Sequence, residues 1–342
     1  MIRRITYFII LGTLRKAADM DATVKATLIF FLMAGSLVTA GTATAQSYPN
    51  RVVKIVVPFA PGGGTDVMAR QIAQKLNEAW MQPVVVENRT GAGGIIGADA
   101  VAKSPADGYT FLLGTTTTAI NASLVVKPPY DMQRDLQPVT MISFYPMAAV
   151  VPAASPVRSL KDLVALSHKQ ALTAGSGGNG TPQHLVLEMF KGASGAKILH
   201  VPYKGGAPAL VALLGAQNDV VFSLWPECLP HVKAGKLRAL AVTTETRLAQ
   251  IADVPTTAEA GFPSVQATGW QGVMVRAGTP KEIVAKINAE VSSIMAVPDM
   301  KARVVEQGFM PVTMDVGETE KFVAADVERW AKIIRDGNIK AE

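Results

Sequence analysis

The stretch from Val52 to Asp66 reads VVKIVVPFAPGGGTD and contains the pattern that organises the chain. Apart from one lysine, Val52 to Val57 are apolar and β-branched, and Pro58 ends the run, which predicts a buried strand. The glycine turn Pro61 to Gly64 follows, and a helical pattern then runs from Thr65 to about Trp80. A strand, a turn and a helix in this order form the repeating unit of an α/β fold.

The same unit recurs further along the chain. Apolar runs at 84–86, 109–113, 171–174, 198–201, 220–222 and 240–242 predict more strands. Helical patterns lie between them at 95–103, 160–167, 207–216 and 230–234. Another helix is expected from Thr181, because a threonine cap is followed there by Pro182 at the first helical position. The alternation predicts an α/β fold with parallel sheets.

The order of these units predicts two lobes. The strand–turn–helix pattern restarts near residue 150, and the tail is mostly helical. Thr279 to Glu282 has the spacing of a capping box, which predicts a helix to about Met295, and a last helix is expected over 316–335. We therefore expect one lobe from residues 46–146 and 270–342, and a second lobe from residues 147–269.

The composition is that of a globular protein. The chain has 342 residues, of which 49% are apolar and 18% charged, and this excludes general disorder. Its net charge is +6, but five basic and only two acidic residues lie in the first 45 positions. The remainder contains no run of lysine and arginine, and aromatic residues make up only 6%. We therefore expect no nucleic-acid partner.

The N-terminal segment has the features of an export signal. The apolar run Ala26 to Ala40 has 15 residues, fewer than the roughly 20 that cross a bilayer as a helix. Lys25 precedes it and the small-residue site Ala43 to Ala45 follows. We expect a signal peptide over residues 1–45, cleavage before Gln46 and a periplasmic mature protein, with Met20 as an alternative start and an uncleaved anchor as the alternative interpretation.

Three glycine turns favour an anionic ligand. They lie at 61–64, 91–94 and 175–180, each between the carboxyl end of a strand and the start of a helix. The free N–H groups and the dipole of a helix N-terminus attract anions, and glycine lets a ligand approach the backbone closely. A purely structural role for each single turn remains the alternative. Together the turns suggest a site for a small dianion between two lobes.

Motifs for catalysis and metal binding are absent from the sequence. The turn at 62–66 lacks the lysine of a phosphate-binding loop, and GAGGIIG at 91–97 departs by one residue from the dinucleotide fingerprint. The four histidines have no metal-binding spacing, and there is no G-x-S-x-G elbow. Cys228 is interpreted as a packed residue beside Glu227. We expect no catalytic residue, no metal and no cofactor.

Several longer motifs resemble those of the Bug family, the extracytoplasmic solute-binding proteins of tripartite tricarboxylate transporters. The similarity extends over about residues 47–340. The motifs are VPFAPGGGTD at 57–66, NRTGAGG at 88–94, VPYKGGAPAL at 201–210, GKLRALAV at 235–242 and VPTTAEAG at 254–261. The resemblance implies a two-lobed periplasmic binding fold, similar to type II, that closes on a small carboxylate. It also implies that backbone groups, hydroxyls and bridging waters hold the ligand.

One position departs from the family pattern. After the strand at 220–222, many relatives resemble M-F-D, with the acidic residue facing the cleft, whereas this chain has Ser223. The loss of that carboxylate puts an amino-acid ligand in doubt, because an ammonium group would lose its partner.

The turns and the motifs together predict the ligand-binding residues. Some of them have structural alternatives: Asp66 as a helix cap, the threonines from Thr115 as the end of a strand, and Trp225 as a core residue rather than a pocket wall. The predicted set is Phe59, Pro61, Gly62, Gly63, Asp66, Thr115, Thr116, Gly178, Gly180, Thr181, Tyr203, Lys204, Gly205, Ser223 and Trp225.

The function expected from the sequence is capture of a small organic anion, a carboxylate, for a tripartite tricarboxylate-type transporter. The expected partners are that ligand and integral membrane transporter subunits, and the protein is expected to be a monomer and not an enzyme. An exported sensor of a small acid is the first alternative, because it would need the same two-lobed shape. An exported α/β enzyme is the second.

Overall fold

The computed structural model describes residues 48–125 and 127–340. From Pro49 onward they belong to one compact unit. The expected signal peptide, its cleavage site and the alternative start lie outside the described residues. Within the described part, no helix has both the length and the apolar character that a membrane crossing requires.

The first sheet has six strands in the order β11-β4-β10-β3-β1-β2. Its interior strands β1 and β3 are mostly buried, as the apolar runs at 52–57 and 109–113 predict. The strands are β1 (Val53–Val57), β2 (Val84–Asn88), β3 (Thr110–Thr115), β4 (Leu136–Tyr145), β10 (Gly269–Arg276) and β11 (Met310–Pro311).

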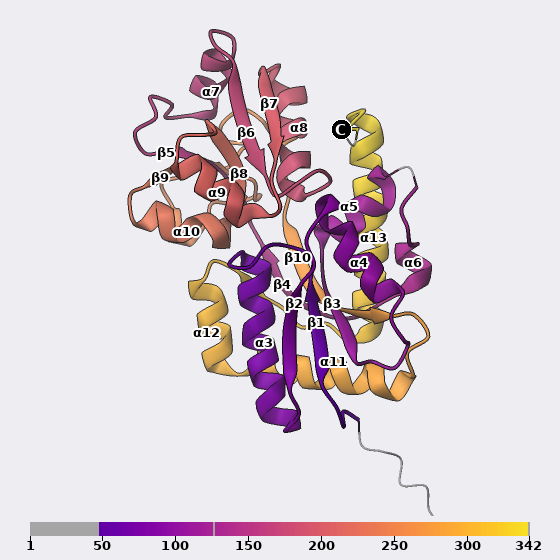
Figure 1. Cartoon of the computed structure of the whole chain (residues 1–342). Coiled ribbons are helices and arrows are strands. Elements are labelled where there is room, and N and C mark those ends of the chain that lie inside the picture. Colours follow the sequence, from indigo (N-terminus) through magenta and orange to yellow (C-terminus); the bar gives the residue numbers. More distant parts are fainter. Residues whose placement is uncertain (1–47, 126, 341–342) are drawn as a thin grey trace, which may run out of the picture. The chain divides into compact units, whose positions relative to one another are not determined.

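The second sheet has five strands in the order β7-β6-β8-β5-β9. Figure 1 shows the two sheets as separate groups of strands, and β4 of the first sheet leads through Pro146 into β5 of the second. The strands are β5 (Met147–Pro152), β6 (Leu172–Ser176), β7 (Ile198–Pro202), β8 (Val220–Leu224) and β9 (Leu237–Val242). The division into lobes at the predicted residue numbers stays a prediction, to which we return below.

Both sheets are mixed, so the predicted parallel pairing holds for only some of the strands. β1 pairs in parallel with β2 and β3, whereas β10 is antiparallel to both β3 and β4. In the second sheet β6 is parallel to β7 and β8, but β5 is antiparallel to β8 and β9. The antiparallel strands β4, β5 and β10 are those that connect the two sheets, and the sequence patterns did not predict them.

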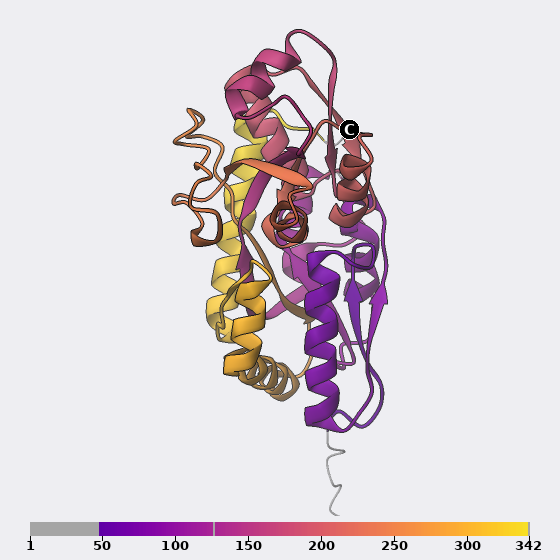
Figure 2. The ribbon, with the colours of Figure 1, turned by 90° about the vertical axis from the view of Figure 1, so that its left-hand side faces the viewer.

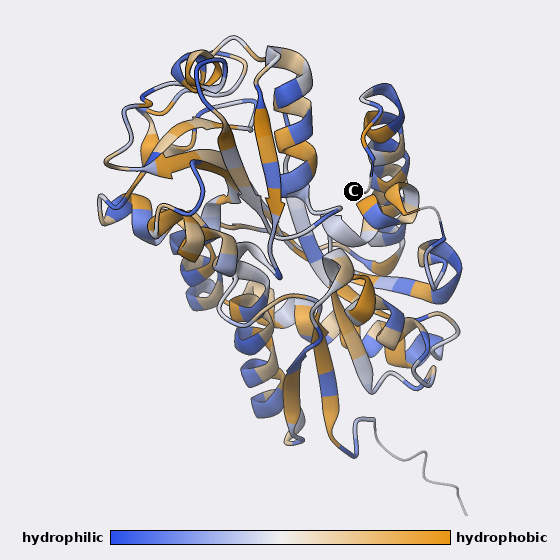
Figure 3. Ribbon diagram, turned by 45° about the horizontal axis from the view of Figure 1, so that its top comes forward, coloured by the Kyte–Doolittle hydropathy of each residue, from blue (hydrophilic) through white to orange (hydrophobic). Residues whose placement is uncertain are grey.

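Helices cover the sheets and turn their polar residues outward. Around the first sheet lie α3 (Gly64–Trp80), α4 (Ile95–Ala102), α5 (Thr116–Leu124), α6 (Met132–Asp135), α11 (Lys281–Ala296), α12 (Pro298–Glu306) and α13 (Val316–Asp336). Around the second lie α7 (Leu160–Ser167), α8 (Pro182–Ser194), α9 (Gly206–Leu214) and α10 (Trp225–Lys233), and two short 3₁₀ turns occupy Ala92–Gly94 and Ala249–Ile251. Figure 3 shows mostly apolar strands and bands of polar and apolar residues along the helices.

Two helix starts differ from their predicted form. Thr115 ends β3 but also caps α5, because its Oγ1 accepts the N–H of Thr117 while its own N–H donates to Thr118 Oγ1. The expected capping box at Thr279 is absent. The Thr279 hydroxyl instead donates to the carbonyl of Arg276 at 2.7 Å, and α11 begins after Pro280 without a side-chain cap.

The last helix returns to the first sheet, as expected, and a buried carboxylate fixes it there. Helix α13 packs against α5 and β4, and it is the long yellow helix along one side of the view in Figure 2. Asp326 on α13 accepts the indole N–H of Trp270 on β10 at 2.7 Å and that of Trp330 at 3.1 Å. The Arg329 guanidinium donates two further bonds to it. Both indole donors are buried and depend on this carboxylate.

The substitution Asp326→Ala should destabilise the protein by about 2–4 kcal/mol, because it leaves two buried indole donors without an acceptor. Urea unfolding followed by tryptophan fluorescence measures the effect. Asp336→Ala on the same helix is the matched control, since that side chain is 61% exposed and its ion pair with Lys332 should contribute little. Equal losses in the two variants would contradict the role of Asp326.

Candidate functional site

The glycine turns of the two sheets meet at the carboxyl ends of their strands. The Ala60 N–H, in the turn after β1, donates to the Lys204 carbonyl in the turn after β7 at 3.2 Å. The Asn121 side chain on α5 donates to the Gly93 carbonyl at 2.9 Å. A Cβ atom on Gly93 would collide with the carbonyl of Asn179, so the second and third turns are in direct backbone contact. The sequence predicted this meeting of turns in general form.

A small cavity of about 20 Å³ lies among these turns. Room of this size holds about one water molecule. The lining comes from the starts of five helices, the turns after β1 and β6, and the ends of β4 and β8. The lining residues are Phe59, Ala60, Gly63, Thr65, Thr115, Thr117, Tyr145, Gly177, Thr181, Pro182, Gln183, Gly206, Leu224 and Glu227.

A larger hollow elsewhere has a different character. It measures about 410 Å³ and lies beside β4 and α13, lined mainly by apolar side chains such as Met132, Leu136, Met274 and Val323. No glycine turn and no helix N-terminus of the predicted site lines it. We therefore take the smaller cavity, where strand ends and helix starts converge, as the candidate site.

The structure brings only some of the predicted residues to this cavity. Four of them line it, namely Phe59, Gly63, Thr115 and Thr181. The others do not line it and are Pro61, Gly62, Asp66, Thr116, Gly178, Gly180, Tyr203, Lys204, Gly205, Ser223 and Trp225.

Two of these residues have structural partners in the second sheet. Ser223 is buried and its hydroxyl donates to the Leu224 carbonyl at 3.0 Å. Trp225 is fully buried in an apolar cluster with β5, β8 and β9, and its indole N–H donates to Gln250 at 2.6 Å. The structure therefore places Trp225 in the core and not in the wall of the cavity.

Asp66 stabilises the first turn through hydrogen bonds on the side away from the cavity. Its carboxylate accepts the Gly62 N–H at 3.0 Å, the Asn88 amide at 2.8 Å and the Arg70 guanidinium at 2.9 Å. Burial alone would raise the pKa of Asp66, but the hydrogen bonds from Arg70, Gly62 and Asn88 lower it below its usual range. Gly63, not Asp66, occupies the cap position of α3. Asp66 thus holds the turn in shape without reaching the cavity.

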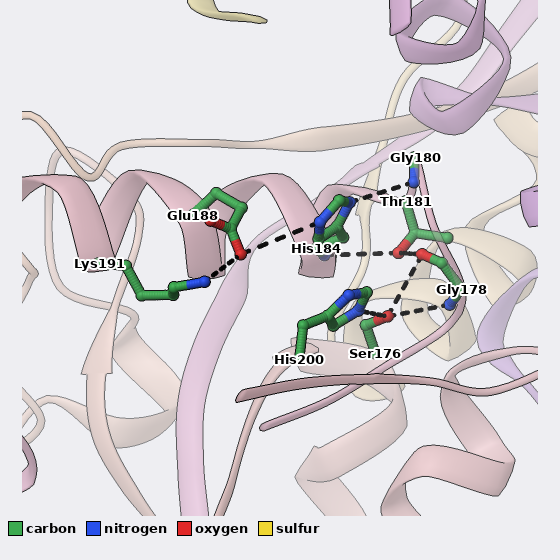
Figure 4. A network of polar contacts seen from close by, with 8 residues as sticks. All are labelled: Ser176, Gly178, Gly180, Thr181, His184, Glu188, Lys191 and His200. Atoms are coloured by element: carbon green, nitrogen blue, oxygen red, sulfur yellow. Dashed lines mark hydrogen bonds and ion pairs between the residues drawn. The ribbon is translucent and has the colours of Figure 1, made fainter. Parts of the chain in front are cut away.

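A buried hydroxyl and two histidines hold the third turn. Figure 4 shows Ser176 between His200 and Gly178. Ser176 Oγ lies 2.6 Å from His200 Nε2 and accepts the Gly178 N–H at 3.0 Å. The Thr181 hydroxyl donates to the Gly178 carbonyl at 2.7 Å. Gly178 has a φ of +124°, which side-chain-bearing residues rarely adopt, so the sequence needs glycine at this point.

Ser176 and His200 are as close as a catalytic nucleophile and its base, but they are not accessible from the cavity. Both residues are buried and neither lines the cavity. The rings of His184 and His200 stack with centroids 4.2 Å apart. Burial, together with the neighbouring His184 and Lys191, lowers the pKa of His200 to about 3, which makes it a weak base. The pair therefore supports the turn.

Helix first turns supply most of the lining residues that the sequence did not predict. Thr65, Thr117 and Gln183 each occupy the second position of a helix, and Glu227 the third position of α10. Side chains of a helix lean toward its N-terminus, so those of the first turn extend over the strand ends. The missed signal was therefore the position of each residue just after a predicted turn.

Glu227 lies at the centre of the site. The Gly64 N–H at the start of α3 donates to its Oε1 at 3.3 Å, and the Gln183 amide donates to its Oε2 at 3.5 Å. The residue as a whole keeps some solvent exposure, but its carboxyl group is enclosed by protein. This burial raises the pKa of Glu227 to about 7, although the bond from Gly64 opposes the shift. Glu227 therefore changes charge near neutral pH.

The raised pKa predicts how Glu227 affects stability. Between the ordinary value of 4.5 and about 7, the folded protein retains a proton that the unfolded chain releases, so rising pH costs stability across this window. Glu227→Gln removes this loss. Its stability relative to the parent should rise by about 1–3 kcal/mol from pH 4.5 to pH 8.

Urea unfolding of both proteins at several pH values measures this difference. Glu282→Gln, a change to an exposed glutamate on α11, is the control and should parallel the parent. A parallel curve for Glu227→Gln as well would mean that Glu227 does not titrate in this window.

The polar groups of the site are hydrogen-bond donors and one carboxyl group, and they do not form a group of metal ligands. Within residues 48–125 and 127–340, no three residues among His, Cys, Asp and Glu are grouped so that they could hold a metal ion. Among the described lining residues there is no lysine, arginine or histidine. The site offers backbone N–H groups, four threonine hydroxyls, a tyrosine, a glutamine and Glu227.

Comparison with known proteins identifies the family of this chain. A family model described as the tripartite tricarboxylate transporter family receptor matches residues 68–339. The protein BugT of Bordetella pertussis is 38% identical over 311 residues, which are 89% of this chain and 95% of BugT.

Solved structures agree with this result. A protein of R. palustris solved with adipate is 36% identical, has a TM-score of 0.82 and matches 86% of this chain and 99% of its own. The periplasmic binding protein BugD is 31% identical and has a TM-score of 0.83, and the match covers 86% of this chain and 100% of BugD. The predicted two-lobed α/β binding-protein fold and the resemblance to Bug proteins are confirmed. The chain belongs to the tripartite tricarboxylate transporter receptor family.

Proposed function

We propose that this protein captures a small organic acid in the periplasm and delivers it to the membrane subunits of a tripartite tricarboxylate transporter. The observation that carries the proposal is the convergence of helix starts on one cavity whose described lining has polar donors and no cationic side chain. A buried carboxylate must be hydrogen-bonded, and N–H and O–H groups serve this purpose without a counter-ion.

Helix α3 begins at the site. Its cap residue Gly63 and its second residue Thr65 line the cavity. The partial positive charge of a helix N-terminus contributes about 0.3–1 kcal/mol to a nearby anion at an exposed site, and more when partly buried. Helix α8, with Thr181 as its cap, begins at the same cavity. The protein of R. palustris solved with adipate supports a carboxylic acid as ligand.

Capture requires that the two halves of the protein separate and close. A cavity of about 20 Å³ has no room for a six-carbon acid, so entry needs a wider cleft. We propose that the lobes comprise residues 46–146 with 270–342, and residues 147–269. The strands of the first sheet fall within 53–145 and 269–311 and those of the second within 147–242, which supports this division to within one residue.

Export, partners and oligomeric state complete the proposal. The expected cleavage before Gln46 would release a periplasmic monomer that docks on integral membrane subunits. The family description names a transporter receptor, which supports this role over that of an exported sensor. The family model is described as a transporter receptor, and BugD is named as a periplasmic binding protein. Among the described residues, the Ser176–His200 pair does not line the cavity, so it does not favour an enzyme.

Gly63→Ala should weaken binding of the captured acid at least tenfold, about 1.4 kcal/mol. Gly63 lines the cavity with an ordinary φ of −76°, so alanine fits the backbone, but its Cβ would lie 3.1 Å from Glu227 Oε1 and occupy ligand space. Titration calorimetry of refolded protein with mono- and dicarboxylates of four to six carbons measures the affinity.

Gly192→Ala is the matched control for this experiment. Gly192 lies on the outer side of α8 with no heavy atom within 4 Å of the new Cβ, so binding should equal that of the parent. Failure of the refolded parent to bind any acid would refute capture. Equal binding by Gly63→Ala and the parent would refute the location of the site.

A further inference from the structure

The Glu227 carboxyl group already occupies the place where a carboxylate would be held. Its two oxygens face the Gly64 N–H on α3 and the Gln183 amide on α8. The Gln183 side chain is itself oriented by the Gly177 N–H, which donates to its Oε1 at 3.1 Å. These are donors of the kind that the proposed function assigns to a ligand carboxylate.

The surrounding backbone makes room for this carboxyl group. A Cβ atom on Gly206, the first residue of α9, would collide with Glu227 Oε2. A Cβ on Gly63 would lie 3.1 Å from Oε1. Gly63 follows a strand of the first sheet, and Gly206 follows a strand of the second. Because neither glycine has a side chain, Glu227 can extend between α3 and α9. The backbone on both sides therefore accommodates the carboxyl group.

No positive charge compensates Glu227 within the cavity. The described lining residues contain no lysine, arginine or histidine. Within residues 48–125 and 127–340, no neighbouring cation lowers the pKa of Glu227. The other titratable groups that sense its charge are Tyr145 at the end of β4 and Cys228 beside it on α10. Burial raises the pKa of both side chains, so both are neutral at physiological pH.

We infer that Glu227 determines the ligand class: the protein selects a small monocarboxylate whose other end carries a hydrogen-bond donor, above all a protonated amine, and disfavours a second carboxylate. The inference rests on the proposed function and narrows it. A ligand ammonium beside Glu227 would supply the missing positive charge, whereas a second ligand carboxylate would meet a like charge in an enclosed space.

Glu227 also replaces an acidic residue that is absent at position 223. Many relatives were expected to have an acidic residue there, whereas this chain has Ser223, which lies within β8. Glu227 lies four residues further along, in the first turn of α10, and its carboxyl group reaches the cavity, whereas the Ser223 hydroxyl bonds to the Leu224 carbonyl. The chain therefore retains a carboxyl partner for an ammonium group at a different position.

The test compares ligands that share chain length and one carboxylate and differ only at the other end. Adipate, its monoamide and 6-aminohexanoate form one such set, and the corresponding derivatives of succinate and glutarate form two more. Titration calorimetry at pH 8, where Glu227 is ionised, gives the affinity of refolded parent protein for each. We expect the best amine or amide to bind at least tenfold more tightly than the matching diacid.

Two substitutions at Glu227 separate its charge from its shape. Glu227→Gln keeps the shape, and the preference for the amine over the diacid should fall at least tenfold. Glu227→Ala frees the Gly64 and Gln183 donors, and affinity for the diacid should rise at least tenfold. Glu282→Gln changes the charge of the whole protein equally at an exposed position and should leave the preference unchanged.

The outcomes distinguish this inference from the proposed function. If the parent binds a diacid as tightly as the matching amine, or if neither Glu227 substitution shifts the preference, Glu227 does not select the ligand while capture of an acid stands. If the parent binds none of the nine compounds, the proposed function fails and this inference fails with it.

Discussion

The direct backbone contact between glycine turns is the constraint on which the site depends. Gly93 and Gly180 have φ values of +58° and +74°, and a Cβ on either would collide, with the Asn179 carbonyl and the Asn121 side chain respectively. Because no side chain separates the turns, the starts of helices from both sheets converge within a few ångströms. Their N–H groups must find partners once they are buried, and this need concentrates donors at one point.

This arrangement produces electrostatics of an unusual kind for an anion site. Attraction comes from oriented dipoles and hydroxyls, and the described lining has no formal positive charge. Dipoles favour one carboxylate strongly but cannot neutralise several, since each contributes only part of a charge. Glu227 already draws on them, and the raised pKa of its carboxyl group shows that they compensate it only in part. A ligand in this cavity must therefore be compatible with the negative charge on Glu227 that the dipoles do not compensate.

Local signals explain which parts of the fold could be predicted. The strand, turn and helix after Val52, the Thr181 cap and the last helix all depend on neighbouring residues, and the structure has each of them. The connecting strands β4, β5 and β10 could not be recognised in this way. β4 contains Pro138, β10 contains two glycines, and their partners lie far away in sequence. The threonines from Thr115 favour a strand by type, but a capping box makes them a helix start.

The site shows the same division between local and long-range information. Glycine turns can be recognised in the sequence, and the structure brings them into contact, but they contribute backbone rather than side chains. The side chains of the cavity come largely from the next residues, in the first turns of α3, α5, α8 and α10. Because helical side chains lean back toward the N-terminus, a residue two or three positions after a turn reaches the site better than a residue in the turn. By this rule Gln183 and Glu227 line the cavity, whereas Gly178 and Trp225 do not.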